Sequence, residues 1–354
     1  MTNLNNKTPM ILDLNLQDWE NFMKEYNHPT YRAKQIFGWL HDKSIFDLDQ
    51  MQNLPRSLKE DILKNLQPMS IQEIDRRESA TDGTIKIVWE LARKNESGNL
   101  VERRIESVLI ISEDRLTVCV STQAGCSLDC AFCATGKIPF EGNLSCGEIL
   151  AQVYEFEKIA GSRITNVVFM GMGEPFMNYD NTMKAAKLLS CEEGKGISAR
   201  KITISTVGVF PRVVQFIEEK QPYNLAISVH TLDHNLRYEL VKGEAKWPIQ
   251  EIIDYLCTNM EKFRPYQVTL EYTLMRNVNM SENDAKMLAR VSCRMGAKIN
   301  LIGVNRTDGK YEAPSAEEVE SFMDVIRQQG ATVFYRFSKG GDIGAACGML
   351  RAEN

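Results

Sequence analysis

Apolar residues recur three and four positions apart in three runs of the first 66 residues: LQDWENFMKEY, YRAKQIFGWLHDK and PRSLKEDILKNL. This spacing places apolar side chains on one face of an α-helix. Pro55 suits the first turn of the third run, where a missing N–H costs the helix no hydrogen bond. The pattern predicts a helical module over residues 1–69.

Short extended runs replace this pattern between residues 70 and 111. TIKIVWELA follows the turn signal Thr81-Asp82-Gly83, and IESVLII follows the turn-forming residues 95–98. Two extended runs joined by a turn are typical of paired strands. We expect a β-hairpin extension or linker over residues 70–111.

From residue 116 onward, extended runs alternate with amphipathic helical runs, which predicts a parallel sheet with helices outside it. The predicted strands are 116–122, 165–170, 201–206, 224–229, 268–274, 298–303 and 332–337. The predicted helices are 146–160, 181–190, 210–219, 249–263, 282–295 and 316–329. The expected fold class is α/β, with a partial (β/α)6 TIM-like barrel over residues 112–354.

Charge and cysteine content restrict the class of protein. The chain has 354 residues, a net charge of −5 and nine cysteines. A negative molecule has no overall attraction for nucleic acid, so an RNA partner would need a local basic patch. Candidate residues, each of which could equally be a solvated surface charge, are Arg76, Arg77, Arg103, Arg104, Arg115, Lys195, Arg200 and Lys201.

The odd number of scattered cysteines argues against a secreted disulfide framework and for a reducing compartment. The first residues, MTNLNNKTPM, do not resemble a secretion signal, and no apolar stretch approaches the length of a membrane span. We expect a soluble, cytoplasmic protein with no membrane partner.

Three cysteines, Cys126, Cys130 and Cys133, lie together in GCSLDCAFCATG, directly after a predicted strand. A zinc ribbon would need a second pair, and the other cysteines are scattered. Buried structural cysteines would follow helix or strand periodicity, which these three do not. Three close thiolates can instead hold three irons of a 4Fe–4S cluster and leave the fourth iron open to a ligand.

Further polar residues fall where predicted strands end, the edge that carries reactive groups in barrel-like α/β folds. The sequence GMGEP includes Gly173 and Glu174, whose turn could approach a ligand or simply be structural. The other residues at strand ends are Ser205, Ser228, Val229, His230 and Asn305. Taken singly, the serines and Asn305 could be loop caps, and His230 a buried, hydrogen-bonded histidine.

The spacing CxxxCxxC, with Phe132 before the last cysteine, resembles the signature of radical S-adenosylmethionine (SAM) enzymes. The motifs LTVCVSTQAGCSLDCAFCATG, NVVFMGMGEPFMNY, KITISTVGVFP, LAISVH, INLIGVN and DIGAACGML together resemble the RlmN/Cfr-type radical SAM methyltransferases of 23S ribosomal RNA adenine. The resemblance covers nearly the whole chain. It implies a 4Fe–4S cluster on Cys126, Cys130 and Cys133, and SAM contacts from Gly173, Glu174, Ser205, Ser228, Val229, His230 and Asn305.

The resemblance also assigns roles to three residues outside the cluster motif. It implies that Cys347 carries a methyl group taken from one SAM, while a second SAM supplies a radical. Cys119 then resolves a covalent protein–RNA adduct and leaves a disulfide, and Glu106 accepts the ring proton. Read without the resemblance, both cysteines would be packing residues and Glu106 an exposed strand residue.

The chain departs from the family pattern at residues 240–249, LVKGEAKWPI, where many relatives carry Pro-Ile-Asn, and at Arg306, where a proline is common. These departures leave carbon 2 and carbon 8 of adenine open as targets, with carbon 2 favoured and transfer RNA a second candidate substrate. We expect a monomer with an electron donor such as flavodoxin or ferredoxin. A non-catalytic, metal-bound RNA-binding module is the alternative of a different class.

Overall fold

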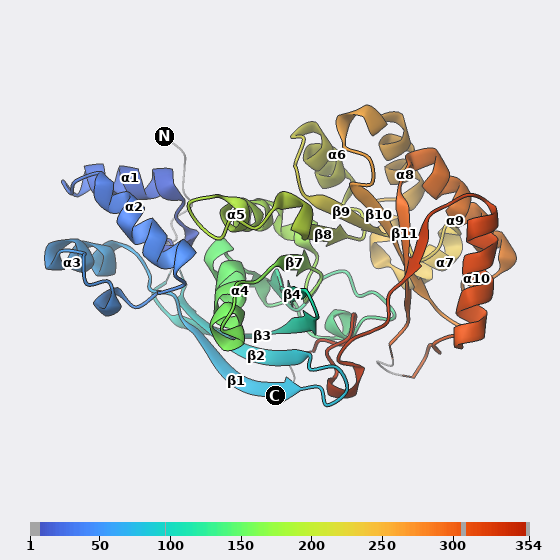
Figure 1. Ribbon diagram of the computed structural model, residues 1–354, viewed down its shortest axis with the longest axis horizontal. Coiled ribbons are helices and arrows are strands. Elements are labelled where there is room, and N and C mark those ends of the chain that lie inside the picture. Colours follow the sequence, from blue (N-terminus) through green and yellow to red (C-terminus); the bar gives the residue numbers. More distant parts are fainter. Residues whose placement is uncertain (1–7, 96, 306–308, 352–354) are drawn as a thin grey trace.

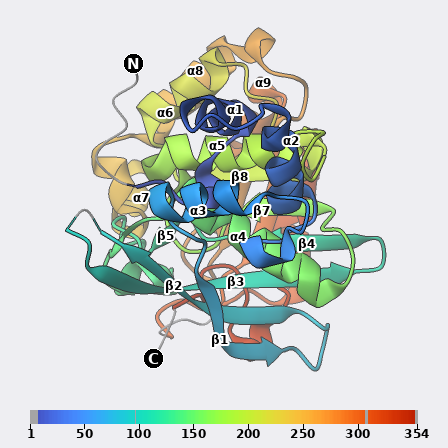
Figure 2. The same cartoon turned by 90° about the vertical axis from the view of Figure 1, so that its left-hand side faces the viewer.

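The computed structural model describes residues 8–95, 97–305 and 309–351, in which a helical module, an antiparallel extension and a parallel barrel follow one another (Figure 1). The module consists of α1 (Leu16–Glu25), α2 (Tyr31–Phe37) and α3 (Arg56–Asn65). All three predicted helices are confirmed, and α2 continues into a π-helical turn at Gly38–Asp42. The module lies beside α4 and α5 of the barrel (Figure 2).

The extension contains three antiparallel strands, β1 (Ile71–Glu78), β2 (Ile85–Lys94) and β3 (Leu100–Ser112). The predicted hairpin corresponds to β2 and β3. Strand β1 was not predicted, because its sequence IQEIDRRE is mostly polar and lies largely exposed at the edge of the sheet. Residue 306, where the sequence departs from its relatives, lies outside the described residues.

The barrel sheet begins at β4 (Arg115–Cys119), which pairs with β3. The extension and the barrel therefore share one ten-stranded sheet. Parallel strands follow in chain order: β7 (Asn166–Phe169), β8 (Ile202–Thr206), β9 (Asn224–Ser228), β10 (Val268–Leu274), β11 (Lys298–Gly303) and β12 (Val333–Tyr335). The predicted α/β barrel is confirmed.

The helices that connect these strands cover the outside of the sheet (Figure 1). They are α4 (Cys146–Ala160), α5 (Tyr179–Ser190), α6 (Phe210–Glu218), α7 (His234–Leu240), α8 (Ile249–Thr258), α9 (Glu282–Met295) and α10 (Ala316–Gln328). Ser145, Ser281 and Ser315 start three of them with capping boxes, in which serine and an acidic residue satisfy free backbone N–H groups. Among the described residues, no helix is long and apolar enough to cross a membrane.

The predicted first barrel strand is shorter than expected. It ends at Cys119, and Gln123–Ala124 forms β5, which pairs with β6 (Gly142–Asn143) in a separate two-stranded sheet. Val120 still exchanges backbone hydrogen bonds with Val168 and Gly171 on the β7 side, and the chain then turns through β5 into the cysteine loop.

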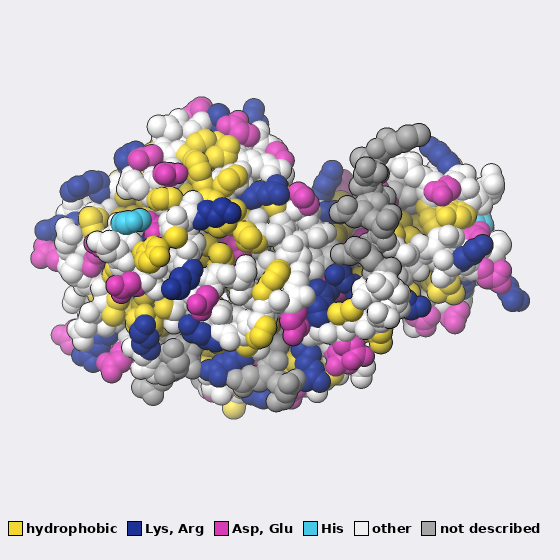
Figure 3. Space-filling view, turned by 180° about the vertical axis from the view of Figure 1, so that it is seen from behind, with side chains coloured by type: hydrophobic (Ala, Val, Ile, Leu, Met, Phe, Trp, Pro, Cys, Tyr) yellow, Lys and Arg dark blue, Asp and Glu magenta, His cyan; other side chains and the backbone are white. Residues whose placement is uncertain are grey.

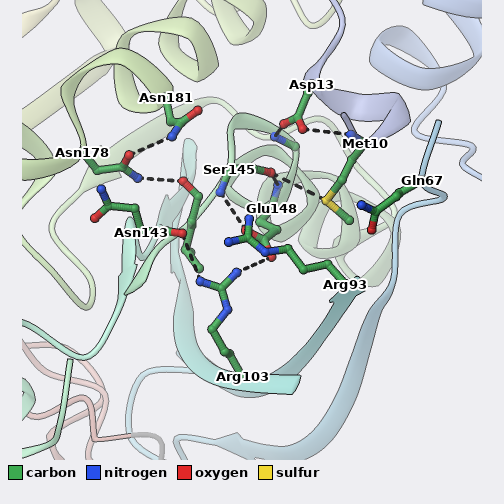
Figure 4. A network of polar contacts seen from close by, with 12 residues as sticks. Met10, Asp13, Gln67, Arg93, Arg103, Asn143, Ser145, Glu148, Asn178 and Asn181 are labelled. Atoms are coloured by element: carbon green, nitrogen blue, oxygen red, sulfur yellow. Dashed lines mark hydrogen bonds and ion pairs between the residues drawn. The ribbon is translucent and has the colours of Figure 1, made fainter. Parts of the chain in front are cut away.

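A buried polar network holds the three parts together (Figure 4). The Glu148 carboxylate, at the start of α4, accepts a hydrogen bond of 2.7 Å from Arg103 of β3, and both side chains are buried. Asp13, which precedes α1, accepts a hydrogen bond of 2.7 Å from the backbone N–H of Gly147. The start of α4 thus fixes both the module and the extension against the barrel.

Candidate active site

The three clustered cysteines lie on the loop between β5 and the 3-10 turn Ala134–Lys137, and all are free thiols. Burial raises the pKa of Cys126 to about 12, and the nearby Cys133 contributes to the rise. Burial also raises the pKa of Cys130, with Cys133 and Cys126 as the next causes. The three thiols thus share one electrostatic environment, and metal binding there must displace protons.

Among the described residues, no three His, Cys, Asp or Glu side chains are arranged to hold a single metal ion. A 4Fe–4S cluster has a different requirement, because each thiolate binds a different iron. Three free thiols on one loop, two of which raise the pKa of Cys130, fit this donor set. The cysteine loop therefore carries the donor groups that such a cluster needs.

The glycines of GMGEP, residues 171–175, permit close packing within the protein. A Cβ on Gly171 would lie 2.7 Å from the carbonyl carbon of Val120, and one on Gly173 would lie 2.5 Å from the Cβ of Gln123. Gly173 also has a φ of +97°, which side-chain-bearing residues rarely adopt. These contacts press the turn after β7 against the chain that leads into the cysteine loop.

Glu174 joins the ends of two neighbouring strands. Its buried carboxylate accepts hydrogen bonds from the backbone N–H groups of Phe176, at 2.9 Å, and Val207, at 3.0 Å. Burial raises the pKa of Glu174 to about 7, although these hydrogen bonds oppose the rise. An ammonium group brought close to Glu174 would favour its ionised form.

Ser205 and Ser228 lie on the adjacent parallel strands β8 and β9, with their hydroxyl oxygens 3.4 Å apart. Both side chains are partly exposed, whereas the next residue, Val229, is fully buried. The two hydroxyls can therefore be reached by a ligand at the strand ends, and Val229 can contribute its backbone.

His230 is buried beside the cysteine loop, with its ring centroid 4.7 Å from that of Phe132. Its Nδ1 accepts a hydrogen bond of 3.1 Å from the backbone N–H of Thr273. Burial lowers the pKa of His230 to about 3, and Arg237 contributes. The ring is thus neutral with its proton on Nε2, so it is a buried, hydrogen-bonded histidine that also borders the loop.

Arg237 was not singled out from the sequence, although it supports the same strand ends. The fully buried guanidinium donates hydrogen bonds to the carbonyls of Ser228 and Val229, both at 3.0 Å, and to that of Val207 at 2.8 Å. It also forms a buried ion pair with Glu244. Glu244 belongs to segment 240–249, so this segment lies behind the strand ends and supports them.

The C-terminal segment that carries Cys347 packs against the cysteine loop. Asn305, after β11, donates a hydrogen bond of 2.9 Å to the carbonyl of Cys347. The backbone N–H of Ala134 donates to the carbonyl of Gly348 at 2.7 Å, and the Thr135 hydroxyl donates to that of Leu350 at 2.7 Å. Cys347 as a whole residue is exposed, but its thiol is withdrawn from water at the loop, and this burial raises the pKa of Cys347.

Cys119 lies at the end of β4 and is partly buried. Burial raises the pKa of Cys119 to about 12; the Cys347 thiol contributes to the rise, and the Arg336 guanidinium opposes it. The two cysteines that are 228 positions apart in the sequence therefore lie within electrostatic reach of each other. No sequence periodicity indicated this proximity.

Glu106 is buried on β3, so its interpretation as an exposed strand residue is wrong. Its Oε1 lies 2.9 Å from the Nζ of Lys86 on β2. Its Oε2 accepts a hydrogen bond of 2.7 Å from the backbone N–H of Arg351, in the same C-terminal segment as Cys347. The carboxylate therefore connects the extension to this segment.

The candidate RNA-binding residues have different environments. Arg103 and Lys195 are buried in ion pairs with Glu148 and Glu157, so they are not available to RNA in this structure. Arg76 and Arg77 pair with acidic neighbours on β1. Basic and acidic side chains are interspersed over the face opposite to that of Figure 1 (Figure 3).

Comparison with known proteins covers both the module and the barrel. The family model "Ribosomal RNA large subunit methyltransferase N-terminal domain" matches residues 10–67, and "Radical SAM superfamily" matches residues 120–288. A "Probable dual-specificity RNA methyltransferase RlmN" of Thermotoga maritima is 39% identical over 97% of each chain. The relative of that name from Salinibacter ruber is 37% identical over 94% of this chain and 91% of its own.

The crystal structure of a radical SAM methyltransferase from Sphaerobacter thermophilus has a TM-score of 0.89 and 37% sequence identity, and the match covers 98% of this chain and 100% of that one. The agreement therefore extends from the N-terminal helices to the C-terminal segment that packs on the cysteine loop. The chain belongs to the RlmN family of radical SAM RNA methyltransferases, enzymes that use a 4Fe–4S cluster and SAM.

Proposed function

We propose that this enzyme methylates carbon 2 of an adenine in 23S ribosomal RNA, in the cytoplasm, with transfer RNA as a second substrate. The observation that carries the proposal is the position of Cys347, on the C-terminal segment that packs against the cysteine loop and within electrostatic reach of Cys119. The relatives' names, which describe dual-specificity RNA methyltransferases, support an RNA substrate.

In this proposal Cys126, Cys130 and Cys133 hold the cluster. Glu174, Ser205, Ser228 and His230 line the SAM site together with the backbone of Gly173 and Val229, and with Asn305. When bound, the cluster and SAM supply a transferable methyl group and a radical that activates a carbon–hydrogen bond. Glu174 is suited to the ammonium group of SAM because its charged form gains from a nearby cation.

Methyl transfer to adenine needs a radical route, because carbons 2 and 8 of adenine are poor nucleophiles. The Cys347 thiolate accepts a methyl group from one SAM. After hydrogen abstraction from that methyl group, its carbon bonds to the adenine ring and forms a protein–RNA adduct. The adduct radical gives up one electron to the oxidised form of the electron-transfer partner, and Glu106 accepts the ring proton, which restores the aromatic ring.

Cys119 then attacks the Cys347 sulfur and forms a disulfide. The sulfur–carbon bond breaks with its electron pair on the carbon, which takes up a proton and becomes the new methyl group. The disulfide must be reduced before the next cycle. We infer a monomer that receives electrons from a donor such as flavodoxin or ferredoxin.

The test is to locate the methyl group on RNA after reaction with reduced protein and SAM. Mass spectrometry of the modified nucleoside should show 2-methyladenosine. Methylation at carbon 8 is the alternative, and 8-methyladenosine as the product would establish it. Unmodified RNA from protein that carries a full cluster would contradict both.

A further inference from the structure

Lys86, on β2, lies on the same face of the sheet as two residues of the proposed reaction. Lys86 pairs with Val108 of β3, and Val108 pairs with Cys119 of β4. Directly paired residues project from the same face of a sheet, as do residues two apart on one strand. Lys86, Glu106 and Cys119 therefore share one face, which continues from the extension into the barrel.

The C-terminal segment that carries Cys347 is bound here by contacts before the cysteine, at Gly340 and Gly344, and after it, at Arg351. Asp82, in the turn before β2, accepts a hydrogen bond of 3.0 Å from the backbone N–H of Gly340. The Nζ of Lys86 donates to the carbonyl of Gly344 at 3.3 Å. Lys86 is thus the group that contacts both this segment and the Glu106 carboxylate.

The ion pair between Lys86 and Glu106 is buried, which makes its loss costly. The side chains of Lys86 and Glu106 are only 7% and 4% exposed, and their charged atoms are 2.9 Å apart. An ion pair withdrawn from water is costly to disrupt, because removing one partner leaves the other charge buried and uncompensated. Without the ammonium, the Glu106 carboxylate would lose the partner that holds its Oε1, and the segment would lose its contact at Gly344.

We infer that Lys86 is a positioning residue for resolution of the protein–RNA adduct. Under the function proposed above, it holds the Glu106 carboxylate, which accepts the ring proton. It also holds the segment that carries Cys347 in a fixed position relative to that carboxylate. Its ammonium does not touch the reacting atoms. Its loss slows proton removal and adduct resolution more than it slows methylation of Cys347.

The experiment compares Lys86→Met, Lys86→Arg and Lys94→Met in single-turnover reactions of the cluster-loaded protein with RNA and SAM. Lys94 is exposed on the same strand, so its variant is the matched control. Gel electrophoresis under denaturing conditions measures the covalent adduct, and intact-mass spectrometry measures methylation of Cys347. Iron content and thermal unfolding establish that each variant is folded.

For Lys86→Met we expect methylated Cys347, a persistent adduct and a product-forming rate lowered roughly 100-fold, the lower range for loss of acid–base catalysis. Lys86→Arg should recover most of that rate, and Lys94→Met should match the wild type. Product formation by folded Lys86→Met at the wild-type rate, or methylated Cys347 with no adduct, would overturn the inference.

If Lys86→Met does not fold, Lys86→Gln replaces it in the same assay, because an amide can still donate to Gly344 but carries no charge. The same two outcomes apply to Lys86→Gln. If the proposed function itself is wrong, the wild-type protein will form neither the adduct nor methylated RNA. The two failures are therefore distinguishable.

Discussion

Two regions contribute to the proposed site in different ways. The barrel rim is the set of loops at the ends of the barrel strands, and the extension face is the side of the sheet that carries Lys86 and Glu106. At the rim, the cysteine loop, Glu174, Ser205 and Ser228 come at or just after the ends of parallel strands. On the extension, Lys86 and Glu106 lie within antiparallel strands and meet a segment 258 and 245 residues further along the chain, respectively. The rim is built from local sequence order, whereas the extension side depends on strand register and tertiary packing.

This difference indicates that the two regions have different roles in the proposed reaction. The rim residues can hold the cofactors, because their loops converge where parallel strands end. The extension and the C-terminal segment instead bring the Glu106 carboxylate and the Cys347 thiol toward Cys119 at the end of β4. Substitutions at the rim should therefore remove the cofactors, and substitutions on the extension should leave the cofactors bound but stall the reaction.

The largest effect is expected for Cys130→Ser. Loss of one of the three proposed thiolate ligands should prevent stable cluster assembly, because the remaining two thiols cannot hold three irons. Iron and sulfide analysis after anaerobic reconstitution should show a nearly cluster-free protein without methyl transfer. Cys293→Ser, an exposed cysteine on α9, is the control and should keep its cluster. A full cluster in Cys130→Ser would contradict the assignment of Cys130 as a cluster ligand.

Glu106→Gln should keep the cluster and lose product. General-base catalysis is typically worth 10²–10⁴-fold, so product formation should fall by roughly that factor while the protein–RNA adduct accumulates. Glu102→Gln, an exposed residue of the same strand, is the control. Product formation by Glu106→Gln at the control rate would show that the extension face does not supply the proton acceptor.

Arg237→Met should destabilise the strand ends that we propose hold SAM. Breaking a buried ion pair typically costs about 3–5 kcal/mol, and here it also removes hydrogen bonds to Ser228 and Val229. Unfolding in denaturant measures the stability, and calorimetry of SAM binding measures the affinity. The exposed pair of Arg294 and Asp254 provides the control, and Arg294→Met should change neither quantity appreciably. Unchanged SAM affinity in a folded Arg237→Met would contradict a role at the rim.

The smallest effect concerns the pH dependence of stability. The pKa of Glu174 rises from an ordinary value of 4.5 to about 7 in the folded protein. Its favourable contribution is complete below pH 4.5 and is lost as the pH rises to about 7, because the unfolded chain ionises first. The difference amounts to at most about 3 kcal/mol. In the metal-free protein, Glu174→Gln should flatten this part of the stability profile; an unchanged profile would exclude Glu174 as its source.

Much of the barrel could be predicted because its signals are local. The strands 268–274 and 298–303 and the helices 146–160 and 282–295 agree with the structure to the residue. The rim residues followed from the same periodicity, since strand ends carry them. Strand β1 was missed because its polar sequence lacks a buried face, and β4 ended early because the chain diverts into β5.

The remaining parts of the site are not encoded by local spacing. Lys86, Arg237 and the proximity of Cys119 to Cys347 depend on contacts between distant segments. A lysine within a β-strand and an arginine within a short helix carry no signal of burial in their own neighbourhoods. The same limit applies to residues that the sequence did single out. Arg103 and Lys195 were candidates for RNA contact, but both are buried in ion pairs.

The most direct test of the central claim is the identity of the adduct trapped by Cys119→Ala. Protease and nuclease digestion followed by tandem mass spectrometry would define both ends of the cross-link. We expect a single methylene bridge from the sulfur of Cys347 to carbon 2 of an adenine. No adduct, or a bridge from another residue, would contradict Cys347 as the methyl carrier.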